Sequence, residues 1–192
     1  MLKYSRVINF KRGNKMELTK CINERRSIRK YKNAEITKAE IEEMIKSAQM
    51  APSWKNSQTA RFFVAHSTEY KEKMIEALPS FNKDRAKDAS CIIVSAIVKG
   101  ISGYNADGEA ITHLGNGFEC FDNGLAVENL CLKAHDMGYG TLIMGLYKEQ
   151  MVREVFDIPE NMAIATVIAV GKADICPDVP QRNALDEVLT IK

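Results

Sequence analysis

The chain has few of the features that bind metals, membranes or nucleic acids. Its five cysteines, at positions 21, 91, 120, 131 and 176, include no CxxC pair, and its three histidines form no ligand-like array, which argues against structural zinc. No apolar run is as long as a membrane span, and the N-terminus lacks the apolar core of a signal peptide. The 27 basic and 25 acidic residues nearly balance, whereas a genomic nucleic-acid binder is usually strongly basic.

The remaining composition is that of an ordinary globular domain. The 192 residues are 45% hydrophobic and 27% charged, enough for one domain with a sizeable core. The odd number and the scatter of the cysteines indicate reduced thiols, so we expect a cytoplasmic protein.

Residues 1–15 are basic and contain no acid. We expect them to be an extension ahead of a native start at Met16, with a single domain over residues 16–192; the intact mass of the protein from its native source tests this.

Hydrophobic spacing predicts the regular elements. Thr37 and Glu40 have the spacing of a capping box, which predicts the start of a helix. Residues 99–117 contain five glycines and predict a mobile loop that covers a site. The strands are not joined in regular βαβ units, so we expect an α+β fold around one sheet. The predicted helices are 17–24, 37–50, a helix capped at 67 or 68 that ends at 78, 118–137 and 148–156; the predicted strands are 62–65, 91–98, 141–144 and 163–170.

The predicted helix 118–137 is apolar on more than one side. A helix of this kind is buried on two faces, and we expect it to pack on its own sheet and on a partner chain. One stripe consists of Phe118, Phe121, Leu125 and Leu132, and the other of Ala126, Leu130, Ala134 and Met137.

Two polar motifs carry most of the functional information. Arg25, Arg26, Ser27 and Arg29 lie within five residues, and arginine presents a planar fork of donors that matches a phosphate. An Arg-Arg-Ser tripeptide is more often a solvated basic helix end. The cluster alone therefore leaves two interpretations open, a phosphate site and a solvated helix end. The second motif, APSWKNSQ at 51–58, is rich in turn formers, but it also places short hydrogen-bonding side chains and one large aromatic in a single connection.

Taken together, these motifs resemble the FMN-dependent nitroreductase family. The matching blocks are RRSIRKY at 25–31, APSxxNxQ at 51–58, Phe-Asn at 81–82, LKAHDMGYGTLIMG at 132–145 and PQRN at 180–183. The resemblance spans roughly residues 16–189. It implies a nitroreductase-like α+β fold with a central, mainly antiparallel sheet flanked by helices, in an intertwined homodimer.

The resemblance also implies FMN as the cofactor and a set of residues that bind it. These are Arg25, Arg26, Ser27, Arg29 and Arg182 for the phosphate and nearby ribityl oxygens; Pro52, Ser53, Trp54 and Asn56 for the isoalloxazine, in a site shared with the second subunit; Asn82 for the pyrimidine edge; and Ile143, Met144 and Gly145, whose backbone approaches the ring near N5.

The implied chemistry takes place on flavin N5 and needs no catalytic side chain. NAD(P)H reduces FMN and leaves, and a small electron-poor acceptor such as a nitroaromatic or a quinone then takes the electrons in a ping-pong mechanism. The chain has no GxGxxG motif after a strand, so NAD(P)H is expected as a transient substrate, and the choice between NADH and NADPH is open.

Two departures from the family pattern bear on how the strand packs and on how the flavin N5 region is polarised. Thr59-Ala60 stands where the family commonly has Pro-Trp, and Met144 stands where many members have Glu. Other interpretations are a different flavin chemistry on the same fold (ene reduction, dehalogenation or flavin breakdown), a non-catalytic flavin carrier and a basic nucleic-acid module. The near-neutral charge and the single tryptophan argue against the last of these.

Overall fold

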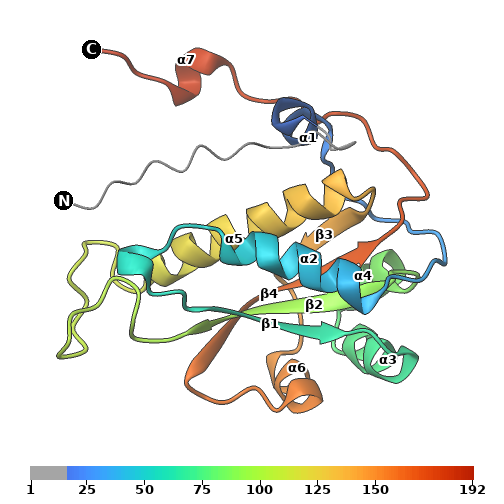
Figure 1. Ribbon diagram of the computed structural model, residues 1–192, viewed down its shortest axis with the longest axis horizontal. Coiled ribbons are helices and arrows are strands. Elements are labelled where there is room, and N and C mark those ends of the chain that lie inside the picture. Colours follow the sequence, from blue (N-terminus) through green and yellow to red (C-terminus); the bar gives the residue numbers. More distant parts are fainter. Residues whose placement is uncertain (1–16) are drawn as a thin grey trace, which may run out of the picture.

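The computed structural model describes residues 17–192, which form a four-stranded sheet with helices on both faces (Figure 1). The strands are β1 (Ala60–Ala65), β2 (Cys91–Val98), β3 (Gly140–Met144) and β4 (Met162–Gly171), in the order β1-β2-β4-β3. Each neighbouring pair is antiparallel, which confirms the predicted α+β fold and its antiparallel sheet. The extension predicted at 1–15 and the predicted start at Met16 lie outside the described residues.

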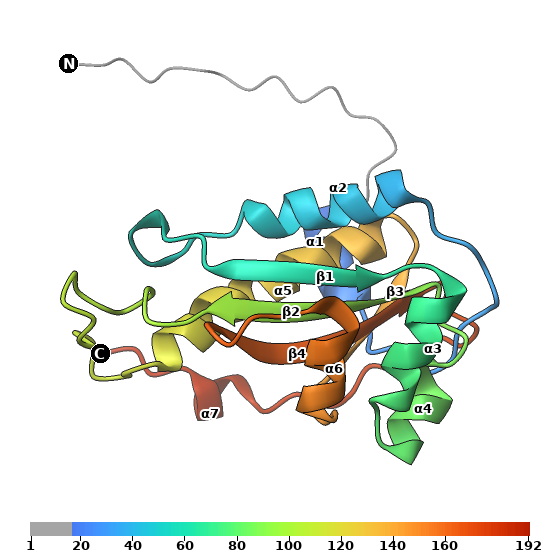
Figure 2. The same ribbon diagram turned by 90° about the horizontal axis from the view of Figure 1, so that it is seen from below.

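The helices form two layers around this sheet. Helices α2 and α5 cover one face, and α3, α4 and α6 lie on the other (Figures 1 and 2). Among residues 17–192 we find no helix long and apolar enough to cross a bilayer, and no group of three or more potential metal ligands. The helices are α1 (Leu18–Glu24), α2 (Lys38–Gln49), α3 (Thr68–Glu76), α4 (Ser80–Ala86), α5 (Gly117–Asp136), α6 (Glu149–Phe156) and α7 (Leu185–Val188), with a 3-10 turn at Trp54–Asn56.

Strand β2 is the centre of the core, as its continuous apolar run predicts. Because side chains alternate along a strand, Ile92 and Val94 join the cluster under α3 and α6, while Cys91 and Ile93 join the cluster under α2 and α5. All four side chains are at most 1% exposed. The centre of the sheet is therefore buried between two hydrophobic clusters, one on each face.

The predicted capping box at the start of α2 is present. Thr37 Oγ1 accepts from the Glu40 backbone N–H, and Glu40 Oε2 accepts from the Thr37 backbone N–H at 2.8 Å. Tyr139 also donates to the Glu40 carboxylate, at 2.8 Å. These bonds, first of all the one from the Thr37 backbone, lower the pKa of Glu40. The stability contributed by Glu40 is thus present above its unfolded pKa and is lost as the pH falls through the lower folded value.

Thr37→Ala should lower the free energy of unfolding by about 1 kcal/mol, because it removes one half of the capping box. The loss should be largest near neutral pH and should shrink in acid, where Glu40 is protonated in both variants. Urea denaturation at the two pH values measures both quantities. An equal loss at neutral and acidic pH would show that Glu40 ionisation has no part in the cap.

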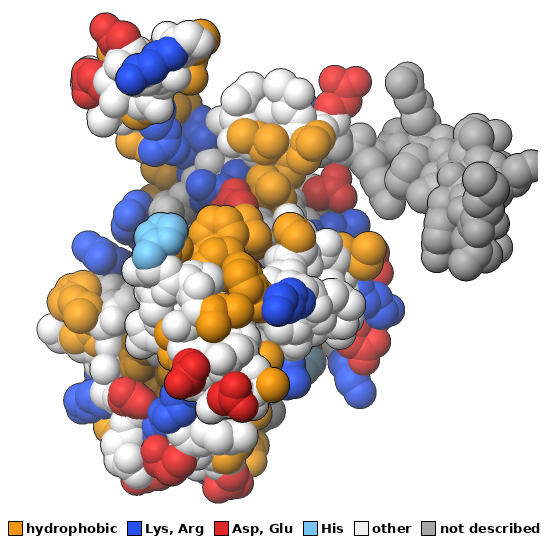
Figure 3. All heavy atoms as spheres, turned by 90° about the vertical axis from the view of Figure 1, so that its left-hand side faces the viewer, with side chains coloured by type: hydrophobic (Ala, Val, Ile, Leu, Met, Phe, Trp, Pro, Cys, Tyr) orange, Lys and Arg blue, Asp and Glu red, His pale blue; other side chains and the backbone are white. Residues whose placement is uncertain are grey.

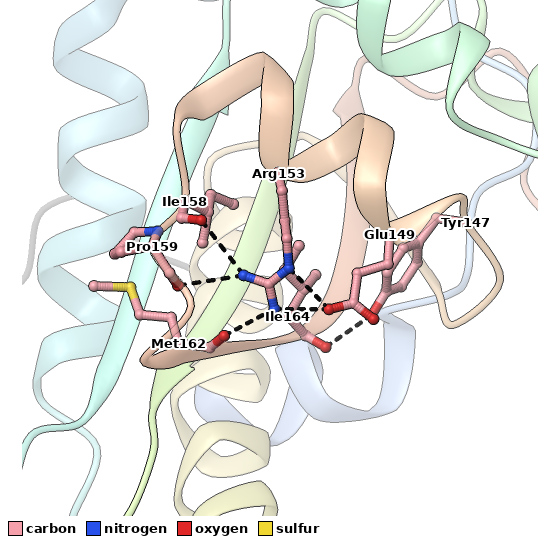
Figure 4. A network of polar contacts seen from close by, with 7 residues as sticks. All are labelled: Tyr147, Glu149, Arg153, Ile158, Pro159, Met162 and Ile164. Atoms are coloured by element: carbon pink, nitrogen blue, oxygen red, sulfur yellow. Dashed lines mark hydrogen bonds and ion pairs between the residues drawn. The ribbon is translucent and has the colours of Figure 1, made fainter.

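Arg153 organises the turn that leads from α6 into β4. Its guanidinium donates to the Glu149 carboxylate at 2.7 Å and to the Ile158, Pro159 and Met162 carbonyls at 2.9–3.4 Å (Figure 4). Asp157 takes a left-handed conformation, with φ of 51°, to end the helix. Five donors in one planar group thus replace regular backbone pairing in this connection.

Helix α5 has the two faces that its stripes predict. Ala126, Leu130 and Ala134 are buried against the sheet and α2, whereas Phe121 of the other stripe is 55% exposed. One stripe therefore forms core within the chain. The other forms a face that is only partly covered, with Phe118, Leu125 and Leu132 half-buried and Phe121 exposed. Whether a partner chain covers that face stays a prediction.

Two short helices differ from the expected pattern. Residues 80–86 form α4 directly after Pro79, and residues 185–188 form α7 in the C-terminal tail; neither is among the predicted helices. Only Asn82 and Ala86 of α4 are buried. Two inward positions one turn apart are too few to show a helical period.

Candidate functional site

The arginine cluster and the C-terminal tail form one cavity. Arg25, Arg26, Ser27 and Arg29 line it from the segment that follows α1, and Arg182 lines it from the other end of the chain. Its volume is about 300 Å³, and Pro177, Asp178 and Pro180 complete the lining. Figure 1 shows the C-terminal segment passing back over α1, which brings these two distant parts of the sequence together.

The segment that carries the cluster is fixed to the sheet by Ile28 and Tyr31. The Ile28 backbone N–H donates to the Thr141 carbonyl at 2.9 Å, beside a parallel bridge between Ser27 and Thr141. Tyr31 is buried, and its hydroxyl donates to the carbonyls of Ile28 at 2.9 Å and Ala169 at 3.2 Å. Inward-pointing Ile28 and Tyr31 thus leave Ser27 and Arg29 pointing outward.

Gly140 makes room for this arrangement. A Cβ atom at position 140 would lie 2.3 Å from Ile28 Cγ1 and 2.8 Å from Ile28 Cβ. Only glycine lets β3 approach the arginine segment so closely.

The start of the C-terminal tail is held in register beside the cluster. The Asp174 backbone N–H donates to the Lys30 carbonyl at 3.0 Å, and Lys30 Nζ pairs with the Asp174 carboxylate at 2.9 Å. The hydrogen bond from Lys30 lowers the pKa of Asp174. This anchor directs the following residues, and with them Arg182, towards the cavity.

The guanidinium groups of the cluster use only part of their donors within the described residues. Arg25 Nε pairs with Glu128 of α5 at 3.4 Å, and Arg26 Nη1 donates to the carbonyls of Asn23 and Arg25. Arg29 Nη1 donates to the Ser27 carbonyl at 3.2 Å. Each of these contacts uses one nitrogen, and each arginine has five N–H donors. The cavity lining thus combines four arginines with a single acid, Asp178.

Asn82 and the end of β3 lie next to each other. Asn82 is 4% exposed, and its Nδ2 donates to the Leu146 carbonyl at 3.4 Å. Ile143 is exposed, whereas the Met144 side chain is buried and its carbonyl accepts from Thr166. A Cβ on Gly145 would meet nothing within 4 Å. Met144 therefore offers no side chain to a ligand.

The segment 52–56 lies elsewhere within the chain. Pro52 and Ser53 line a cavity of about 300 Å³ between α2, β1 and α5, and Trp54 lines another, of about 420 Å³, against the loop that follows β2. Asn56 lies beside Trp54 in the 3-10 turn, with φ of 57°. Neither cavity includes a residue of the arginine cluster. The structure thus brings together the predicted phosphate residues, but one chain does not bring them together with segment 52–56.

Comparison with known proteins identifies the relationship. The sequence profile described as "Nitroreductase family" matches residues 22–172. The chain belongs to the nitroreductase family. A relative from Archaeoglobus fulgidus, whose provisional name is NADH dehydrogenase/NAD(P)H nitroreductase, is 34% identical over 159 residues, covering 81% of this chain and 84% of the relative. A relative of the same provisional name from Methanothermobacter thermautotrophicus is 30% identical and covers 82% of this chain and 78% of itself.

The fold agrees with that of solved nitroreductases. A nitroreductase from Exiguobacterium sibiricum, also named provisionally and solved in complex with FMN, superposes with a TM-score of 0.81. It is 23% identical and covers 92% of this chain and 98% of its own. At this identity the similarity shows a shared fold.

The two departures from the nitroreductase pattern have clear structural settings. Thr59 is 1% exposed, and its Oγ1 is buried without a hydrogen-bond partner among the described residues. Ala60 opens β1 opposite Ile97. Met144 fills core space under β3. The strand therefore packs regularly despite the departure at Thr59-Ala60.

Sequence reasoning missed one residue that organises the site. Asp122 of α5 is 5% exposed and accepts from the Trp54 backbone N–H at 2.8 Å. The signal was present, because Asp122 lies one turn before Ala126 on the stripe that faces the core. A carboxylate at such a position needs donors around it.

Proposed function

We propose that this nitroreductase is an FMN-dependent NAD(P)H oxidoreductase. The observation that carries the proposal is the cavity in which three arginines and Ser27 meet Arg182 from the opposite end of the chain. Family membership, the NAD(P)H nitroreductase names of relatives and the FMN complex of a structural neighbour support it.

The cavity suits the phosphate of FMN. Guanidinium and hydroxyl groups are donors, and a phosphate dianion is rich in acceptors, so each added pair is a charge-assisted hydrogen bond. Arg25, Ser27, Arg29 and Arg182 would hold the phosphate, with Arg26 beside them. Asn82 would bind the polar edge of the ring, and the backbone of Ile143–Gly145 would pass close to it.

FMN, when bound, supplies the two-electron chemistry between NAD(P)H and an electron-poor acceptor such as a nitroaromatic or a quinone. The chain itself binds and orients the cofactor and both substrates. Because one pocket serves both substrates in turn, the mechanism is ping-pong. The scattered thiols, all five of which are unpaired in the described residues, fit a cytoplasmic protein.

The functional unit in this proposal is a homodimer. Asp122, which holds Trp54, and Glu128, which holds Arg25, are six residues apart on α5, so they differ by about 9 Å along the helix and point to different sides. A second chain can supply segment 52–56 to the arginine site. Exposed apolar side chains gather at the end of the molecule shown in Figure 3, where the 99–117 loop and the start of α5 lie; Ile111, Leu114 and Phe121 are each at least 50% exposed.

A site shared between chains predicts complementation. Arg25→Ala and Trp54→Ala should each impair both sites of a homodimer, but a heterodimer of the two variants contains one site with both defects and one with neither. Co-expression with two different affinity tags, followed by NAD(P)H oxidation assays, should therefore recover activity at one site per heterodimer. Activity no better than that of either parent would place each site within one chain.

Anaerobic spectroscopy tests the proposed activity. The purified protein, saturated with FMN, should lose its visible flavin absorbance when NADH or NADPH is added, and a nitroaromatic should restore it. Bound FMN that neither NADH nor NADPH reduces would indicate a flavin carrier. Reduction by NAD(P)H without reoxidation by nitroaromatics or quinones would indicate another flavin chemistry on this fold.

A further inference from the structure

The segment that follows α2 is held in an unusual backbone conformation. Lys55, Asn56 and Gln58 have φ values of 46°, 57° and 49°. Residues with a Cβ avoid this left-handed region and remain there only where their surroundings hold them. Some contact must therefore fix this turn, which also carries Trp54.

Asp122 supplies that contact from α5. One of its oxygens, Oδ2, accepts from the Trp54 backbone N–H at 2.8 Å and from Ser102 Oγ at 2.5 Å. Asp122 is 5% exposed, and Ser102 is fully buried. A single buried carboxylate thus holds two segments that are far apart in the sequence, the turn at 54–56 and the start of the 99–117 loop.

Packing around Asp122 joins the same two segments. The Trp54 and Phe118 rings lie 4.8 Å apart in an edge-on arrangement, and a Cβ added at Gly103 would lie 3.0 Å from Phe118 Cβ. One turn from Asp122, Glu119 accepts from the Gly100 backbone N–H at 2.5 Å. The first turns of α5 therefore hold the loop by two hydrogen bonds, and they hold Trp54 by one hydrogen bond and a ring contact.

The two segments that Asp122 joins are the walls of one cavity. This is the cavity of about 420 Å³. One wall is formed by Trp54, Lys55 and Ser57, and the other by Gly100, Ile101 and Tyr104. A shift of either segment would change the width of the cavity.

We propose that Asp122 is a positioning residue that sets Trp54 against the 99–117 loop and so fixes the shape of this cavity, which would lie beside the cofactor in the proposed homodimer. The inference rests on the proposed function, since it assigns the cavity to the substrates of that activity. Asp122 acts through Trp54 and Ser102, without touching the cofactor. Its loss should raise the KM for the electron acceptor more than it lowers kcat.

Trp54 is the only tryptophan of the chain, so its fluorescence reports on this turn directly. Asp122→Leu keeps the approximate volume of the side chain but removes the acceptor. In the flavin-free protein, we expect Trp54 to become more accessible to acrylamide. In the FMN-loaded protein, we expect the KM for the electron-accepting substrate to rise about tenfold, the scale of a hydrogen bond to a charged group. Asp122→Asn keeps an acceptor oxygen and should restore both properties.

Glu119→Met is the matched control, because it removes a buried carboxylate from the same helix that holds the loop but not Trp54. It should leave acrylamide quenching of Trp54 at the wild-type value. If folded Asp122→Leu protein also shows wild-type quenching and wild-type acceptor KM, the inference is wrong.

Hydrogen exchange covers the case in which Asp122→Leu does not fold. In the flavin-free wild-type protein the Trp54 amide should be protected at least ~100-fold relative to an unfolded chain, because its acceptor is buried. Free exchange would overturn the inference. This measurement needs no cofactor, so a protein that fails to bind FMN would contradict the proposed function while leaving the role of Asp122 at Trp54 to be judged separately.

Discussion

Arg25→Ala should weaken FMN binding by about 2–3 kcal/mol, or roughly 30- to 150-fold in Kd, the cost of leaving charge-assisted bonds to a phosphate unmade. Arg25 lines the cavity, and its side chain is only 23% exposed, so its charge is partly shielded from water. Fluorescence titration of the flavin-free protein with FMN measures the effect. An unchanged Kd would mean that the phosphate binds elsewhere.

Two control variants separate phosphate binding from a structural role of Arg25. Its ion pair with Glu128 at 3.4 Å is the contact that Arg25→Ala removes within the chain. Glu128→Ala removes the same pair from the other side and should leave FMN affinity equal or slightly higher. Arg25→Lys keeps the charge but loses the planar fork, so its Kd should lie between those of wild type and Arg25→Ala.

Gly140→Ala should lower the free energy of unfolding by about 1–3 kcal/mol, the usual cost of overpacking a core. The new Cβ would stand 2.3 Å from Ile28 Cγ1, and Ile28 lies between Ser27 and Arg29. The clash should therefore also weaken FMN binding. Thermal melting should show a decrease of about 2–4 °C for each kcal/mol lost.

A double-mutant cycle shows whether the clash with Ile28 is the cause. Ile28→Ala alone should be destabilising because it leaves a cavity. Combined with Gly140→Ala it should cost less than the sum of the two single changes, since the smaller side chain makes room for the new methyl group. Gly124→Ala is the control for a glycine substitution without a clash. A Cβ there meets nothing within 4 Å, and we expect a slight gain in helix stability. Strict additivity of Gly140→Ala and Ile28→Ala would contradict the clash.

Strong local patterns predicted most of the fold. The apolar run at 91–98 forms β2 with the predicted bounds, and the Thr37 capping box opens α2. Helix α4 was missed because the period of a seven-residue helix with two buried positions is too weak to detect. The tail helix α7 has no buried residue and so gave no apolar pattern.

The candidate site was predictable only where motifs are dense in sequence. The arginine cluster follows from five consecutive residues, and Arg182 was added through family resemblance rather than through any local signal. The hydrogen bond between Asp122 and Trp54 joins residues 68 positions apart. No local pattern in a single sequence shows which distant residues come into contact. Its clue was a carboxylate on the buried stripe of α5, which indicates that partners exist without naming them.

The central claim is that the arginine cavity holds the phosphate of FMN, and a comparison of FMN with riboflavin tests it most directly. The two ligands share the isoalloxazine ring and differ by the phosphate. In titrations of the flavin-free protein, we predict that FMN binds at least ~100-fold more tightly than riboflavin, since several charge-assisted bonds depend on the phosphate. In Arg25→Ala protein that preference should shrink, with riboflavin affinity unchanged. Equal affinities of the wild-type protein for FMN and riboflavin would contradict the account.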